Sequence, residues 1–266
     1  MSEIRALLLA AGKGTRLRPM TEGCPKCLVP IAGRPLLEYW LCSLYRCNIS
    51  TVWVNLHHQW QMVHGFLSRD CFAGWVNELY EDKLLGTAGT LGASAREFSD
   101  STTFLAHADN WLQSDLSKFL DFHIHHRPAG TVMTMMTFRT TTPESCGIVE
   151  IDDKKVVIDF HEKIDGFQGN LANGAVYLLE PEVVQWVAQR SKVTDFSSQV
   201  IPQFVGRIAT WENKGIHRDI GTLSSLLAAQ ADPYPEPCWP QDDAWMLSYA
   251  RHPVHKALAN STASPQ

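Results

Sequence analysis

The chain has 266 residues, of which 45% are hydrophobic and 19% charged, and its formal net charge is −5. This size buries a substantial core, and the acidic balance without lysine- or arginine-rich runs disfavours a nucleic-acid surface. The longest apolar run near the N-terminus, residues 6–11, falls far short of the roughly 20 residues that span a bilayer. Seven scattered cysteines fit reduced thiols, so we expect a cytoplasmic protein with no membrane or nucleic-acid partner.

The first half of the chain alternates strand-like and helix-like segments. Strands are predicted at 4–10, 51–56, 74–80 and 103–108, and helices at 35–47, 59–68 and 115–126. Glycine-rich loops follow the first and third strands. This alternation predicts βαβ units in an α/β fold, a Rossmann-like mixed, mostly parallel sheet flanked by helices, with ligands at the carboxyl ends of strands.

In the second half, strand-like segments at 131–138, 147–151, 155–161 and 172–178 have short connections, which favour some antiparallel pairing. Helices at 182–190 and 195–204, a strand at 207–211 and a helix at 222–231 follow. Residues 232–266 are rich in proline and tryptophan at their start. We predict that they form an irregular tail packed on the body with a frayed end.

The loop after the first strand, "LAAGKGTRLR", is the first candidate for chemistry. A glycine-rich turn after a buried strand exposes backbone N–H groups that can hold phosphate oxygens. It lacks the spacing of a P-loop, and Leu17 stands where a dinucleotide fingerprint needs its third glycine. A plain tight turn is the alternative, but Arg16 and Lys26 favour phosphate binding.

The longer motif resembles a known family. "LLLAAGKGTRLRPMT" followed by "PKCLVPIAGRPLLEY" resembles the N-terminal signature of the sugar-1-phosphate nucleotidylyltransferases. Within that family, the resemblance is greatest to the short mannose- and heptose-1-phosphate guanylyltransferase-like members. The resemblance extends to about residue 230 through "EDKLLGTAGTL", "FLAHADNW", "GIVEID…VIDFHEK", "NGAVYLL", "DFSSQVIPQF" and "HRDIGT".

The resemblance implies a single-domain nucleotide-diphospho-sugar transferase fold over residues 1–231, with 1–128 mainly binding the nucleotide and 129–231 mainly the sugar phosphate. It also implies an enzyme that joins a sugar 1-phosphate to a nucleoside triphosphate (NTP) with release of pyrophosphate. A sugar-phosphate oxygen would attack the α-phosphorus in line, which requires cations and positioning more than a protein nucleophile.

The family pattern assigns roles to particular residues. The expected catalytic residues are Arg16, Lys26, Asp109, Lys163 and Asp219, and the two aspartates would hold Mg²⁺. The expected nucleotide-binding residues are Leu9, Ala11, Gly12, Lys13, Gly14, Thr15, Arg16, Lys26, Glu81, Gly86, Thr87 and Gly89. The expected sugar-phosphate-binding residues are Asn110, Gly147, Glu162, Lys163 and Asn173.

Each assignment has a plainer alternative. Asp109 and Asp219 could each cap a following helix, Glu162 and Lys163 could be an exposed charged pair, and Asn173 could turn a bend. The Cys24-x-x-Cys27 spacing has no second ligand pair for zinc, and neighbouring prolines favour an extended segment, so both cysteines are expected to be framework residues. We expect the histidines at 123, 125 and 126 to lie at a solvated helix end, and the role of His107 stays open.

The form "LGTAG" favours GTP as the nucleotide, with uridylyl and thymidylyl transfer as alternatives within the family. Two other classes stay open: a catalytically silent homologue that binds nucleotide sugars, and a dinucleotide-dependent oxidoreductase. The missing third glycine counts against the oxidoreductase. The sugar and the oligomeric state, including a homo-oligomer, are left undetermined by the sequence.

Overall fold

The computed structural model describes residues 3–162 and 169–262, and the chain divides into two compact units. Unit 1 comprises Met1–Leu7, Lys83–His107 and Gln113–His217, and unit 2 comprises Leu8–Asp82, Ala108–Leu112 and Arg218–Gln266. Both units are therefore assembled from segments far apart in the sequence. A single division at residue 128, which the sequence analysis predicts, does not follow these units.

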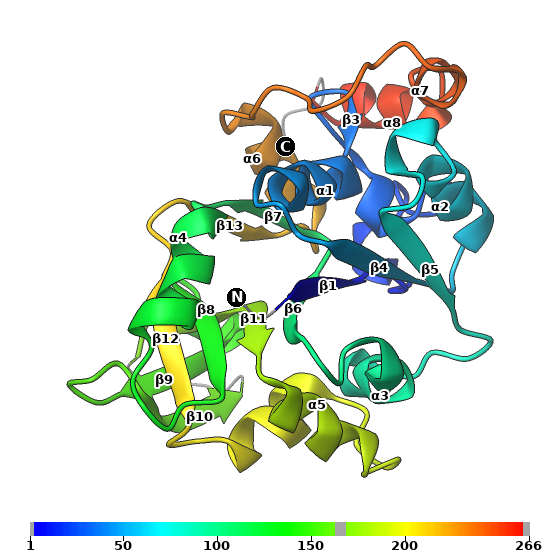
Figure 1. Ribbon diagram of the computed structural model, residues 1–266. Coiled ribbons are helices and arrows are strands. Elements are labelled where there is room, and N and C mark those ends of the chain that lie inside the picture. Colours follow the sequence, from blue (N-terminus) through cyan, green and yellow to red (C-terminus); the bar gives the residue numbers. More distant parts are fainter. Residues whose placement is uncertain (1–2, 163–168, 263–266) are drawn as a thin grey trace. The chain divides into compact units, whose positions relative to one another are not determined.

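Unit 1 is built on a sheet in which strand directions are mixed (Figure 1). Its strand order is β10-β9-β11-β6-β1, with β8 paired to β11 and β12 paired to β8. The β9/β10, β6/β11 and β8/β11 pairs are antiparallel, whereas β8 and β12 are parallel. The strands are β1 Ile4–Leu9, β6 Thr102–His107, β8 Met133–Arg139, β9 Gly147–Ile151, β10 Val157–Glu162, β11 Leu171–Leu179 and β12 Ile208–Glu212.

Three α-helices belong to unit 1: α3 Thr87–Ala93, α4 Leu116–Asp121 and α5 Pro181–Ala188. α3 packs on α5, where Gly92 lets the two helices approach, since a Cβ there would lie 3.3 Å from Val187. The short helical turns are η4 Ala95–Glu97, η5 Phe122–His126, η6 Pro143–Ser145, η7 Phe196–Val200 and η8 Ile201–Gln203. The helix predicted over 195–204 is thus two short turns.

Unit 2 contains the parallel strands β4 Thr51–Leu56 and β5 Val76–Tyr80, joined through the helix α2 Trp60–Leu67. It also holds α1 Leu36–Arg46, the small hairpin of β2 Pro30–Ile31 and β3 Arg34–Pro35, and α6 Leu223–Ala231. Its short turns are η1 Thr15–Leu17, η2 Lys26–Leu28 and η3 Asp70–Phe72. β1, β7 Asn110–Gln113 and β13 Ile216–Asp219 each pass from one unit into the other.

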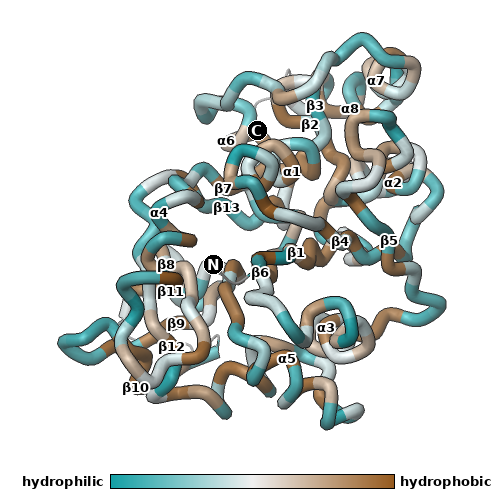
Figure 2. Tube along the Cα trace, in the orientation of Figure 1, coloured by the Kyte–Doolittle hydropathy of each residue, from teal (hydrophilic) through white to brown (hydrophobic). Residues whose placement is uncertain are grey.

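The α/β class expected from the sequence, a mixed sheet with flanking helices, is confirmed. β1 is hydrophobic along most of its length (Figure 2), and its residues Ala6, Leu7 and Leu8 are fully buried. The glycine-rich turn follows directly where this strand ends. No helix in the described residues combines the length and the apolar character needed to cross a bilayer.

The segment after Ala231 packs on unit 2 as predicted, but the prediction that it is irregular is wrong. It forms two helices, α7 Ala244–Tyr249 and α8 Pro253–Thr262 (Figure 1). Asp243 caps α7 by accepting a hydrogen bond from the Met246 amide, which gives the proline-rich stretch a defined helix start. The Trp245 ring contacts Phe66 with 5.0 Å between ring centroids, so the helix is anchored by aromatic packing.

Candidate active site

The glycine-rich turn in unit 2 follows β1 and is held tightly at Gly14. Gly14 adopts a φ of +60°, and a Cβ there would lie 3.0 Å from the Thr21 side chain and 3.1 Å from that of Lys26. The Thr21 hydroxyl donates to the Gly14 carbonyl at 2.7 Å. The amides of residues 12–15 donate to no acceptor among the described residues. The turn therefore presents a row of N–H groups that suits an anion.

Asn55 fixes the beginning of this turn. Its side-chain oxygen accepts from the amides of Ala10 at 2.6 Å and Ala11 at 3.2 Å, and its amide nitrogen donates to Glu81 at 2.9 Å. Asn55 and Glu81 lie at or just beyond the ends of neighbouring strands and are both buried. Glu81 is thereby tied to the glycine-rich turn, although 70 residues of sequence separate them.

Four charged residues meet beside the turn. The buried Nζ of Lys26 lies 2.8 Å from Oδ2 of Asp109 and 3.0 Å from Oδ1 of Asp219. Arg16 Nη2 is 3.2 Å from the other oxygen of Asp219 and is largely exposed. The structure thus brings together four of the five residues expected to be catalytic. The fifth, Lys163, lies outside the described residues.

The electrostatics keep Lys26 and Asp219 ionised. Burial lowers the pKa of Lys26, but the carboxylates of Asp109 and Asp219 raise it by more, so the pKa ends above its ordinary value. For Asp219, burial raises the pKa, whereas Lys26 and Arg16 lower it, and the net pKa is below its ordinary value. A charged ammonium is therefore held between carboxylates in a partly desolvated site.

The donor set of this cluster fits a divalent metal. The Lys26 ammonium is a cation already held by both carboxylates, so it stands in for an ion at the same donors. Carboxylate oxygens are hard ligands of the kind that Mg²⁺ prefers, and Mg²⁺ keeps several waters that substrate phosphates can replace. Asp109 and Asp219 are the residues that would hold it.

The local structure removes the helix-cap alternative for both aspartates. Asp109 directly precedes the strand β7, and Asp219 ends the strand β13. The N-cap of α6 is instead Thr222, which forms a capping box with Ser225. A Cβ at Gly221 would lie 2.7 Å from Asp219 Oδ2 and 3.0 Å from Arg16 Nη2, so a side chain there would displace these two groups.

The second glycine-rich loop lies in unit 1 and packs against residues 194–196. Gly86 has a φ of +81°, and a Cβ there would clash with the Thr194 carbonyl, which also accepts from the amide of Gly89 at 3.3 Å. The Thr87 hydroxyl accepts from the Phe196 amide at 2.7 Å. These glycines therefore permit a close backbone contact within unit 1. Their expected contact with a nucleotide base stays a prediction.

A second group of expected residues comes together in unit 1. Gly147 is paired with Glu162 across β9 and β10, and the Glu162 carboxylate accepts from the Ser197 hydroxyl at 2.6 Å. Asn173 donates to the buried Tyr177 hydroxyl at 2.7 Å and accepts from the Ala175 amide, so it supports a bend in β11. Burial raises the pKa of Tyr177. The bend and a sugar-binding role for Asn173 are compatible.

Ser197 and Asn55 are residues that the sequence analysis does not assign. Ser197 lies in the quoted "DFSSQV" segment, and the only signal for Asn55 is a polar residue inside a buried strand. Of the remaining expected residues, Leu9 ends β1, and its carbonyl accepts a hydrogen bond from the Ala108 amide. Asn110 is buried, and its carbonyl accepts a hydrogen bond from the Trp40 indole. Lys13 is exposed on the turn.

The cysteines and histidines act in packing. Cys24 and Cys27 are fully buried, and burial raises the pKa of the Cys24 thiol to about 12, which disfavours a thiolate. His123 contradicts the expectation of a solvated helix end: it is 1% exposed, and its Nδ1 lies 2.7 Å from the Thr134 hydroxyl. His107 ends β6 and is half-buried.

Unit 1 also has a cavity of about 750 Å³ next to β12, lined in part by Lys118, Lys155, Trp211 and Asn213. Of the expected site residues that the structure describes, none lines this cavity. Its size alone does not make it the reaction site, because the cluster of charged residues and the glycine-rich turn lie in unit 2.

Known structures share this fold, the nucleotide-diphospho-sugar transferase fold. HddC from Yersinia pseudotuberculosis matches with a TM-score of 0.72 and 22% identity, over 86% of this chain and 98% of that one. The sequence profile described as Nucleotidyl transferase matches residues 5–234. The chain therefore belongs to the nucleotidyl transferase family.

Among characterised relatives, the chain is 26% identical over 235 residues to mannose-1-phosphate guanylyltransferase of Mycobacterium tuberculosis, which covers 86% of this chain. It is 29% identical over 222 residues to UTP–glucose-1-phosphate uridylyltransferase of a Synechocystis strain, which covers 76% of this chain. The chain spans 64% and 55% of the lengths of these two relatives.

Proposed function

We propose that this chain transfers a nucleotidyl group from an NTP to a sugar 1-phosphate, giving a nucleotide sugar and pyrophosphate. The observation that carries the proposal is the convergence of Lys26, Asp109 and Asp219 beside the turn whose amides are available to an anion. The relatives act on sugar 1-phosphates, which supports the same substrate class here. Unit 2 supplies the triphosphate-binding groups in this proposal.

Each group has a defined task in the reaction. An oxygen of the sugar phosphate attacks the α-phosphorus, a P–O bond forms, and the bond to pyrophosphate breaks. The amides of residues 12–15 and the Arg16 guanidinium neutralise charge on the triphosphate, and Lys26 moves from the carboxylates toward the phosphates. Mg²⁺ held by Asp109 and Asp219 would stabilise charge on the phosphate oxygens and the leaving pyrophosphate.

Glu162, Lys163 and Asn173 are proposed to bind the sugar phosphate, as the family resemblance implies. Glu162 and Asn173 offer acceptors and donors for sugar hydroxyls, with Gly147 leaving room beside Glu162. Lys163, the next residue along the chain, is proposed to hold the phosphate. The assignment of residues 1–128 mainly to the nucleotide and 129–231 mainly to the sugar phosphate stays a prediction.

The base is proposed to be guanine because of Glu81. An ionised carboxylate is an acceptor only, and guanine presents two adjacent donors, N1–H and the exocyclic amino group. Uracil and thymine present one N–H between two carbonyls, which a carboxylate repels. The hydrogen bond from Asn55 and the burial of Glu81 hold the carboxylate in place and make a mismatch costly.

The test of this assignment is Glu81→Gln. A bidentate pair to a base is worth about 1–3 kcal/mol, so kcat/KM for GTP should fall roughly 10- to 100-fold, while the ratio of UTP to GTP use should rise. The glutamine amide both donates and accepts, which suits uracil. Glu78→Gln is the matched control, because Glu78 lies on β5 three residues before Glu81 and is paired with His64, and it should leave the ratio unchanged.

Nucleotidyl transfer and the selection of guanine can be disproved separately. A wild-type preference for UTP over GTP, unaltered by Glu81→Gln, would contradict guanine selection and leave nucleotidyl transfer intact. Binding of nucleotide sugars without turnover of any NTP would instead indicate the catalytically silent class.

A further inference from the structure

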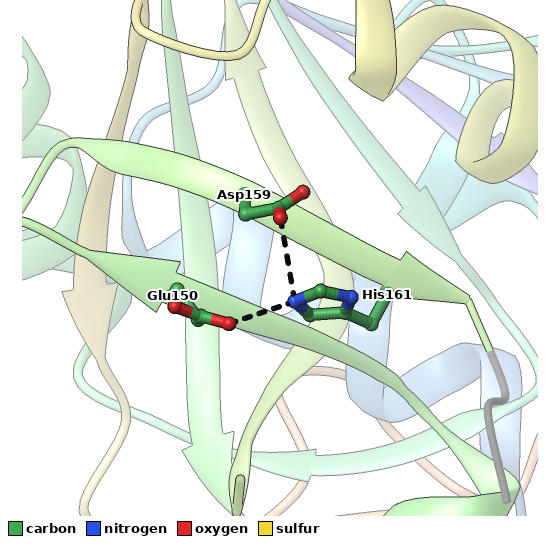
Figure 3. Close-up of side chains that lie close together, drawn as sticks. All are labelled: Glu150, Asp159 and His161. Atoms are coloured by element: carbon green, nitrogen blue, oxygen red, sulfur yellow. Dashed lines mark hydrogen bonds and ion pairs between the residues drawn. The ribbon is translucent and has the colours of Figure 1, made fainter. Parts of the chain in front are cut away.

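A second candidate metal site lies in unit 1, on the hairpin formed by β9 and β10. Glu150, Asp159 and His161 each offer one ligand atom, and these atoms all lie within 4.8 Å of one another. The side chains come from two neighbouring strands, and both carboxylates point toward the same nitrogen of the His161 ring (Figure 3). None of the three residues belongs to the sites described above.

The strand register explains why they meet. Asp159 is paired with Glu150 across the hairpin, and His161, two residues further along β10, lies on the same face. A register shift between Val157 and Asp159 sets this alignment, as a β-bulge does when it redirects side chains. The Asp159 carboxylate is oriented by the Phe160 amide, which donates to its Oδ1 at 2.7 Å and leaves Oδ2 toward His161.

Of the two distances from the imidazole nitrogen, the one to Asp159 fits a tetrahedral coordination shell, and the one to Glu150 is that of a hydrogen bond. His161 Nε2 is 2.9 Å from Glu150 Oε1 and 3.6 Å from Asp159 Oδ2. Zinc–ligand bonds of about 2.0–2.2 Å place neighbouring ligand atoms roughly 3.3–3.6 Å apart in such a shell. Small side-chain movements on a fixed hairpin would therefore admit an ion, and no backbone change is needed.

The charges also favour a cation at this place. Two carboxylates lie near one imidazole nitrogen, and that nitrogen carries at most one hydrogen to donate to them. Within the described residues, neither Glu150 nor Asp159 forms an ion pair with a lysine or an arginine. Both carboxylates are about half exposed, so water can complete the coordination.

We propose that Glu150, Asp159 and His161 bind a zinc-class divalent transition-metal ion, separate from Mg²⁺ at Asp109 and Asp219. The imidazole determines which class of metal ion binds, because histidine nitrogen suits zinc and other transition metals, whereas Mg²⁺ takes oxygen ligands. The ion cross-links β9 and β10 immediately before Glu162. It is a structural site with an open position, and it requires no part in the reaction.

The test uses Zn²⁺ as the probe and isolates the site by mutation. In an Asp109→Asn/Asp219→Asn background, isothermal titration should show one Zn²⁺ per chain, and Zn²⁺ should raise the melting temperature. Adding His161→Gln should weaken Zn²⁺ binding more than tenfold and abolish the thermal shift. Co²⁺ should give visible absorption bands that His161→Gln removes.

His126→Gln is the matched control, since His126 is exposed and its ion pair involves one carboxylate, that of Asp121. It should leave Zn²⁺ binding unchanged. Zinc binding that survives His161→Gln would overturn the proposal. So would the absence of stoichiometric zinc binding in the Asp109→Asn/Asp219→Asn background. Neither result depends on turnover, so the proposal fails or stands independently of the nucleotidyl transfer.

Discussion

The ammonium group of Lys26 is placed between two carboxylates in unit 2, although the proposed substrate is an anion. In this arrangement the lysine balances Asp109 and Asp219 before substrate and metal bind. Its raised pKa means that it remains a cation throughout. In the proposed reaction, a metal ion replaces Lys26 at these oxygens, so that Lys26 reaches the phosphates without leaving the carboxylates unpaired.

Lys26→Met tests this role. We expect kcat/KM for pyrophosphate release to fall about 100- to 1000-fold, as for the loss of other preorganised charged donors. Binding of Mg²⁺ to the two aspartates should become tighter in the same variant, because the competing ammonium is gone.

Lys154→Met, which removes an exposed lysine from unit 1, should leave both quantities unchanged. A variant at Lys26 that folds and keeps kcat/KM within about threefold of wild type would rule out the proposed role, since one charge-assisted contact is worth far more than that.

At the residue scale, sequence reasoning finds charged residues within contiguous motifs and misses polar residues that support them from elsewhere. Arg16, Lys26, Asp109 and Asp219 are expected from the motifs, and the structure brings them together. Asn55 bonds the turn across 45 positions of sequence, and no local pattern reveals such a partner.

At the scale of elements, the buried histidine after α4 joins three parts of unit 1. Arg127 Nη1 donates to Glu180 Oε1 at 2.6 Å and lies 2.7 Å from His123 Nε2, while His123 Nδ1 meets Thr134 on β8. Burial lowers the pKa of His123, whose Nε2 also lies 3.0 Å from Glu180 Oε1. The network connects η5 with β8 and the start of α5.

Glu180→Gln tests the contribution of this network to stability. Hydrogen bonds from His123 and Arg127 lower the pKa of Glu180 from 4.5 to about 2. Because folding lowers this pKa, the ionised carboxyl stabilises the fold at pH values above its pKa in the unfolded chain. This contribution is lost as the pH falls from 4.5 toward 2. Near neutral pH we expect a loss of about 2 kcal/mol in the free energy of unfolding by urea.

The difference between wild type and Glu180→Gln should shrink as the pH is lowered through this range. Glu182→Gln breaks an exposed ion pair with Arg207 and should cost less than about 1 kcal/mol. A loss for Glu180→Gln that is independent of pH would contradict the electrostatic origin.

Long elements with a clear period are predicted well, and short ones are not. The strand predicted at 51–56 and the helix at 59–68 agree with β4 and α2, because their apolar spacing extends over the whole element. β7 and β13 have four residues each, too few for a period to appear. These are the strands that place the aspartates, so the geometry of the site is less predictable than its composition.

At the scale of the whole chain, the C-terminal segment completes the interior of unit 2. Arg69 and Glu38 form an ion pair, with side chains 3% and 0% exposed. Arg69 also pairs with Asp243, Glu38 accepts from Gln241, and Tyr249 donates to the Leu28 carbonyl beside Lys26. The tail therefore shields buried charges and supports the segment that carries the lysine.

Truncation after Asp232 should expose this interior and lower the melting temperature by more than about 10 °C, because unpairing a buried ion costs 3–5 kcal/mol or more. Truncation after Thr262 is the control and should leave the melting temperature unchanged. Tyr249→Phe should cost about 1 kcal/mol through the lost hydrogen bond. A chain truncated after Asp232 that melts like wild type would contradict a structural role for the tail.

The most direct test of nucleotidyl transfer is a pyrophosphate-release assay of the full chain with a panel of NTPs and sugar 1-phosphates. We predict release that requires an NTP, a sugar 1-phosphate and Mg²⁺ together, with GTP preferred and a nucleotide sugar formed in equal amount. Absence of pyrophosphate with every pair of substrates, or release that does not depend on the sugar phosphate, would contradict the proposed function.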